Sequence, residues 1–133
     1  MQMMFLPQGV LDHIDRLVRR FLWGDTEIHK HMHLLSWETV TKPKLYGGLS
    51  IRDAFCCNQA FLINQAWRIW RNEHSLLAKF LRHRHYRNSD FLLTSSSHGS
   101  RAWKAILCGR DLMKKGLCWV VQSGHSINFW LDH

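Results

Sequence analysis

The helical spacing of apolar residues is the feature that most constrains how this chain can fold. Over residues 1–24, apolar residues recur three or four positions apart, as on one face of an α-helix. That face comprises Val10, Ile14, Leu17, Val18 and Phe21. The opposite face carries charges that we expect to lie in solvent: Asp12, Asp15, Arg16, Arg19 and Arg20. Pro7 suits the start of such a helix and Gly24 its end.

Further stretches with the same spacing predict three more helices within residues 53–116. The first covers 53–73 with Asp53 as its cap, and the others begin after Ser75 and Ser100. Their apolar faces are, in order, Phe55, Leu62, Ala66, Ile69 and Trp70; Leu76, Leu77, Phe80 and Leu81; and Trp103, Ile106, Leu107 and Met113. Gly116 suits the end of the last helix, and the Ser-rich residues 88–100 are interpreted as a loop.

The remaining segments lack this spacing. Residues 25–52 contain turn signals such as Pro43 and predict a linker, within which Ser36 could cap a single helical turn. Residues 117–133 alternate apolar and polar positions around a turn, which predicts a β-hairpin. The expected fold class is therefore mainly α: about four helices, a long linker after the first and a short C-terminal β-hairpin.

The charge of the chain favours polyanions as partners. Its 133 residues include 18 Lys and Arg and 10 Asp and Glu, which gives a formal net charge of +8. The excess of basic residues lies in residues 45–133. Each base placed on a phosphate releases condensed counterions, so a basic chain is suited to nucleic acid. A basic surface without a specific ligand is the alternative.

The basic run over residues 82–87 is the strongest candidate site. Its three guanidinium groups, Arg82, Arg84 and Arg87, suit phosphate contacts, and Tyr86 suits stacking on a base. The alternative is the exposed end of a helix with Tyr86 packed inward. Five later residues could extend the patch: Arg101, Lys104, Arg110, Lys114 and Lys115. The seven Trp residues are better explained as core than as stacking platforms.

Metal and cofactor sites are weakly indicated. His29, His31 and His33 would point to one side of an extended segment and could hold a metal, but a solvated linker explains them better. The four cysteines show no Cys-x-x-Cys spacing, and reduced, mostly buried thiols are expected. We therefore expect no metal and no cofactor.

Catalytic motifs are equally weak. No two acids are adjacent, and neither a phosphate-binding Gly-rich loop nor a Gly-x-Ser-x-Gly elbow occurs. No catalytic residue is predicted, although an enzyme remains a third alternative. The chain has no apolar run of about 18 residues and no secretory signal, so a nuclear or cytoplasmic protein without a membrane partner is expected.

The order of residues resembles a known family over nearly the whole chain. The longest matching blocks are Phe5-Leu6-Pro7, Arg20-Phe21-Leu22-Trp23-Gly24, Gly47-Gly48-Leu49-Ser50-Ile51-Arg52, Leu76-Leu77-Ala78-Lys79, Gly109-Arg110-Asp111-Leu112 and Trp130-Leu131-Asp132. Together they resemble the segment that follows the reverse transcriptase domain in plant LINE-type (non-LTR) retrotransposon polyproteins. Two departures are Ser50, where the family usually has Gly, and the Cys56-Cys57 pair.

The resemblance implies a fragment of a larger polyprotein. In the family, the polymerase core with its catalytic aspartates lies upstream, and a zinc-binding module, often with ribonuclease H, lies downstream. No catalytic or zinc residue of the family falls on this chain. The implied role is a connector or thumb-like segment that helps hold RNA or DNA, with the polymerase and zinc-binding segments as partners. A truncated structural remnant without independent activity is the competing hypothesis.

Overall fold

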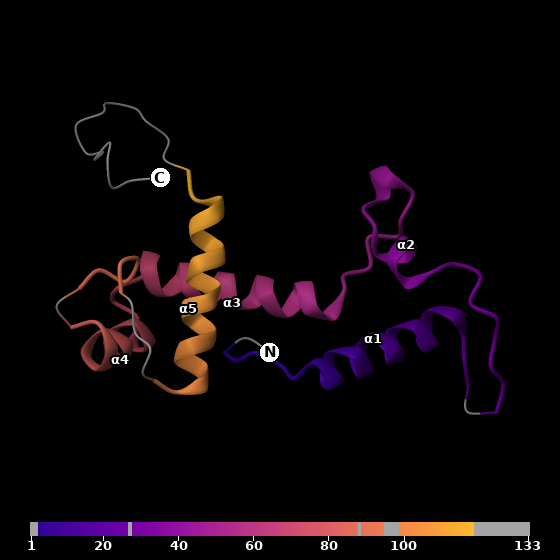
Figure 1. The fold of residues 1–133 in the computed structure, drawn as a ribbon, viewed down its shortest axis with the longest axis horizontal. Coiled ribbons are helices and arrows are strands. Elements are labelled where there is room, and N and C mark those ends of the chain that lie inside the picture. The colour runs from indigo at the N-terminus through magenta and orange to yellow at the C-terminus, as the bar shows by residue number, and fades with distance from the viewer. Residues whose placement is uncertain (1–2, 27, 88, 95–98, 119–133) are drawn as a thin grey trace. The chain divides into compact units, whose positions relative to one another are not determined.

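The computed structural model describes residues 3–26, 28–87, 89–94 and 99–118 (Figure 1). Its elements are, in order, α1 (Gln8–Trp23), α2 (Trp37–Thr41), the 3-10 helix η1 (Lys44–Tyr46), α3 (Ala54–Arg71), α4 (Leu76–His85) and α5 (Arg101–Gly116). The mainly α fold class is therefore confirmed. The hairpin predicted over 117–133 lies outside the described residues, apart from positions 117 and 118, which are in no strand. Within the described ranges, no helix is long and apolar enough to cross a bilayer.

Side-chain caps begin four helices at the positions that the sequence predicts. The Ser75 and Ser100 hydroxyl groups each accept a hydrogen bond at 3.2 Å from the backbone N–H three residues on, at the starts of α4 and α5. Ser36 does the same for α2 at 3.3 Å. At the start of α3, the Asp53 carboxylate accepts from the Cys56 N–H at 3.1 Å. These contacts satisfy N–H groups that have no partner inside the helix.

The chain divides into two compact units, the first made mainly of Phe5–Ala60 and the second of the residues that follow. Hydrogen bonds between distant residues hold the first unit together. The Asp15 carboxylate on α1 accepts from the Ala54 N–H at 3.0 Å. The Leu6 N–H donates to the side-chain oxygen of Asn58 at 3.3 Å. Both contacts fasten the N-terminal segment to the first turns of α3.

Only one edge of the apolar face of α1 is covered, which corrects the prediction for the first helix. Leu11 is 2% exposed and Asp15, predicted to lie in solvent, is 8% exposed. By contrast, Val10, Leu17 and Phe21 are 45%, 49% and 89% exposed. The rest of the first unit covers α1 along the border between its predicted apolar face and its predicted charged face. The apolar arc of α1 is wider than the surface that covers it, so part of the arc stays exposed. We call the exposed set Val10, Leu17 and Phe21 the α1 stripe.

The core of the second unit joins α3, α4 and α5. Its buried residues are Ala66, Ile69, Ala78, Leu81, Tyr86, Phe91, Trp103, Ile106, Leu107 and Met113. α5 crosses α3 (Figure 1), and a Cβ atom added at Gly109 would stand 2.6 Å from the carbonyl group of Leu62. Only glycine therefore allows this close approach. Much of the predicted core is confirmed. The prediction is wrong for three residues, since Phe55, Leu76 and Phe80 are 43%, 88% and 60% exposed.

The predicted linker contains ordered turns. The single turn after Ser36 is confirmed as α2, and η1 follows it. Ser50, at the position where the resemblance expects glycine, has a φ of 57°, in the left-handed region that glycine adopts at least cost. Its hydroxyl accepts a hydrogen bond from the Lys44 N–H, and its own N–H donates to the Lys42 carbonyl, both at 3.0 Å. These two bonds hold the serine in that conformation.

Candidate nucleic-acid interface

The basic run lies at the C-terminal end of α4 and just beyond it. Arg82 and Arg84 stand in the last turn, Arg87 follows, and all three are exposed. Cations at this end also stabilise the helix, because its last carbonyl groups carry partial negative charge. Arg82 pairs with Glu73 at 3.2 Å, and both side chains are more than half exposed. Such exposed pairs contribute little free energy, so opening this pair costs little.

Tyr86 does not belong to the exposed surface. It is 8% exposed, and its ring lies nearly parallel to that of Trp103, with centroids 6.0 Å apart. Burial raises the pKa of its hydroxyl group. The alternative in which Tyr86 packs inward is therefore the observed one. Its ring is part of the core rather than a platform for a base.

The outer face of α4 carries a feature that the sequence prediction missed. Phe80, predicted to be buried, is exposed, and Arg84 follows it by four residues. Residues at this spacing are neighbours on a helix, with Cβ atoms about 5–6 Å apart. Lys79 and His83 are exposed on the same side. We define the α4 outer face as Lys79, Phe80, His83 and Arg84. The signal that the sequence prediction missed is the spacing of four residues between the aromatic Phe80 and the basic Arg84.

The structure does not gather the predicted bases of α5 into one cluster. Arg101 and Lys104 lie in its first turn, and Lys114 and Lys115 in its last. At a rise of 1.5 Å per residue, the two groups stand about 15–20 Å apart. Three of these residues are exposed, and Lys114 is partly buried. They therefore provide two separate points of positive charge.

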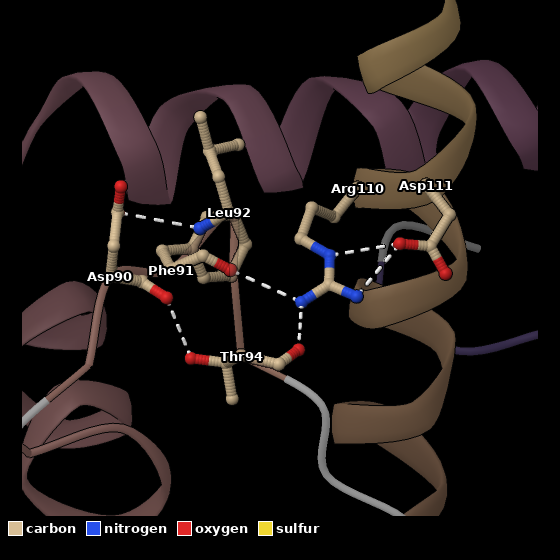
Figure 2. Close-up of polar contacts among 6 residues, drawn as sticks. All are labelled: Asp90, Phe91, Leu92, Thr94, Arg110 and Asp111. Carbon is tan, nitrogen blue, oxygen red and sulfur yellow. Dashed lines mark hydrogen bonds and ion pairs between the residues drawn. The ribbon is translucent and has the colours of Figure 1, made fainter. Parts of the chain in front are cut away.

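Arg110 is a buried clamp, not an extension of the basic patch (Figure 2). Its Nη1 donates to the carbonyl oxygens of Phe91, at 3.1 Å, and of Thr94. Its Nε and Nη2 donate to one carboxylate oxygen of Asp111, at 3.0 and 2.7 Å. All three of its nitrogen atoms thus donate to partners inside the protein. Arg110 fastens the segment around Phe91 to α5, and it is unsuited to a phosphate.

Two carboxyl groups meet in the first unit although the sequence separates them widely. Asp15 and Asp53 interact electrostatically, and burial, followed by the proximity of Asp53, raises the pKa of Asp15. Because Asp15 also accepts from Ala54 and Asp53 caps α3, the pair acts as a structural joint between α1 and α3.

The three histidines of the linker, weighed as a metal site, do not converge. His33 Nε2 lies 2.9 Å from an Asp25 carboxylate oxygen, and its ring stacks on Trp23 at 5.6 Å. The backbone N–H of His31, rather than its ring, contacts Asp25. Over the residues with described positions, no group of three metal-binding side chains occurs. The expectation of mostly buried thiols is wrong: Cys56, Cys108 and Cys118 are exposed, and Cys57 is partly buried.

Comparisons with known proteins identify two relatives in Arabidopsis thaliana. The chain is 36% identical over 137 residues to a protein named "Putative ribonuclease H protein", in an alignment that covers 99% of this chain and 22% of that protein. It is 34% identical over 114 residues to an "Uncharacterized mitochondrial protein", covering 84% of this chain and 74% of the relative. The chain therefore spans about a fifth of the length of the first relative.

No protein-family model matches the chain, and no solved structure matches it significantly. The second relative nevertheless aligns over most of both proteins at more than 30% identity. The chain therefore belongs to the plant protein family that includes this uncharacterized mitochondrial protein.

Proposed function

We propose that the chain is a connector segment of a plant LINE-type retrotransposon protein, and that it holds RNA or DNA by contacts to phosphates. The ordered residue matches and a relative named as a ribonuclease H protein support this proposal. In the parent protein, the polymerase and zinc-binding segments would be its neighbours, in the nucleus or the cytoplasm. The role is binding without catalysis and without reading of base sequence.

The exposed bases at the end of α4 carry this proposal. Arg84 and Arg87 make no ion pair within the described residues, and the pair made by Arg82 is exposed. The sequence of α4 contains no acid, so nothing on the helix itself repels a phosphate. Arg101, Lys104, Lys114 and Lys115 supply further contacts farther along a strand.

Salt dependence of binding tests the proposal. Binding of the full chain to a labelled 12-nucleotide strand, followed by fluorescence anisotropy, should weaken steeply between about 50 and 200 mM salt. Replacing Arg84 and Arg87 with Gln should lower the slope of log affinity against log salt by about 0.7 for each phosphate that the protein no longer neutralises.

Arg16→Gln is the matched control, because it removes one exposed charge from α1 in the other unit. It should leave the slope nearly unchanged. If the control changes the slope as much as Arg84→Gln or Arg87→Gln does, then overall charge, rather than the bases at the end of α4, drives binding. A flat salt response would contradict the proposal altogether.

A structural remnant is the second candidate, and the α1 stripe favours it. Phe21 is 89% exposed beside Val10 and Leu17, and an apolar row of this kind marks a surface that other parts of a longer protein would cover. Absence of binding even at low salt, with the chain folded, would leave this interpretation as the better one.

A further inference from the structure

We propose that the α4 outer face binds an unpaired strand, with Phe80 stacked on a base and the flanking cations on the adjoining phosphates. This inference rests on the proposed function and names its ligand. It assigns to Phe80 the stacking role that the sequence suggested for the buried Tyr86. The ligand is single-stranded RNA or DNA rather than a duplex.

The position of Phe80 carries the argument. Its side chain is 60% exposed, whereas the inner side of α4 buries Ala78 and Leu81 in the core of the second unit. The core is therefore complete without this ring. An exposed aromatic ring gains free energy when it leaves water, and the flat face of a nucleobase is one surface that covers it.

The surroundings of the ring select the occupant. Arg84 lies one turn beyond Phe80, and Lys79 and His83 lie on the same exposed side. An acidic polymer is favoured by this charge, and every base of a nucleic acid offers a π-face next to a phosphate. In a duplex the faces of the bases are stacked on one another, so only an unpaired strand satisfies both the ring and the cations.

Three ligands with equal numbers of phosphates separate stacking from charge. They are a labelled 12-nucleotide single strand, its abasic counterpart and a duplex with the same total number of phosphates. Phe80→Ala in the full chain should weaken binding to the normal strand about tenfold. Binding to the abasic strand and to the duplex should stay within twofold, because their phosphate contacts remain.

Further variants keep the test falsifiable if the alanine variant folds poorly. Phe80→Trp should retain affinity, and Phe80→Leu, which is apolar but has no ring, should lose it. Leu93→Ala, which shortens another exposed apolar side chain of the second unit, should have no effect. Circular dichroism confirms that each variant is folded.

The outcomes distinguish the two proposals. If the wild-type chain binds none of the three ligands, the proposed function fails. If it binds all three equally and with a steep salt dependence, the proposed function stands and the stacking inference is wrong. If Phe80→Leu binds as tightly as wild type, the ring is not stacked, and the face is better assigned to an apolar protein partner.

Discussion

Arg110 illustrates, at the residue scale, what local sequence does not reveal. Near Lys114 and Lys115 it resembles one more surface base, yet it is 7% exposed. Its partners are backbone carbonyl groups of Phe91 and Thr94, 19 and 16 residues earlier in the chain. A periodic pattern reports which side of a helix is apolar, but not which distant carbonyl groups require a donor. Only the folded chain shows that this arginine is structural.

Replacing Arg110 with Ala should lower the free energy of unfolding by about 2–3 kcal/mol, because buried carbonyl groups lose a charged donor. Urea unfolding followed by circular dichroism measures the loss. Arg110→Lys should recover only part of it, since one ammonium group does not reach all three partners.

The matched control for Arg110 is Asp111→Ala. This variant removes the partner whose side chain is 59% exposed, so it should cost less than about 1 kcal/mol. Equal losses for the alanine variants at 110 and 111 would show that the ion pair, and not the carbonyl contacts, holds the segment.

His85 should make the stability of the chain depend on pH. Its ring stacks on Trp103 at 4.3 Å, and burial, followed by the charge of Arg84, lowers its pKa below the ordinary 6.5. The unfolded chain therefore binds this proton more readily than the folded chain, and stability should fall as the pH drops through about 6.5. His85→Phe keeps a ring on Trp103 but does not titrate. Between about pH 7.5 and pH 5.5, roughly one unit on either side of the ordinary histidine pKa, the midpoint of thermal unfolding should fall less for this variant than for wild type. Equal falls in the two proteins would contradict the assignment to His85.

At the scale of elements, helix starts were predictable and helix coverage was not. Ser75 and Ser100 cap helices through contacts three residues away, a range that local sequence contains. Which edge of α1 is buried depends on Ala54, 39 residues beyond Asp15. The sequence shows a broad apolar arc there, and only the packing partner decides that Leu11 is covered while Phe21 is exposed.

The crossing of α3 and α5 should be intolerant of any side chain at Gly109. A methyl group there would meet the Leu62 backbone at 2.6 Å, and backbone gives way less readily than a side-chain tip. Gly109→Ala should lower the free energy of unfolding by about 1–3 kcal/mol despite the better helix propensity of alanine. Urea unfolding measures this loss.

Gly116→Ala is the control for the crossing. It lies in the same helix, with nothing within 4 Å of an added Cβ, so it should be neutral or slightly stabilising. A neutral Gly109→Ala would mean that the two helices separate without cost.

For the whole molecule, the net charge was predictable from the sequence, but the set of side chains that share one surface was not. The net charge of +8 follows from the sequence, and the bases at the end of α4 are exposed as expected. Phe80, predicted to be buried, is exposed, whereas Tyr86 packs inward against Trp103, as the alternative for the basic run expected. The proximity of Asp15 and Asp53 was equally unpredictable, because the two residues are far apart in the sequence.

The hydrogen bonds that close the first unit have a consequence for the order in which the chain folds. They join residues 39 and 52 positions apart, and closing loops of this length costs about 3 kcal/mol in chain entropy. The helices of the second unit follow one another along the chain and assemble through shorter loops. On the ribosome, α1 emerges before α3, and it must wait for residues 54–58 before it can dock. α1 thus lacks this docking partner until the start of α3 has been synthesised.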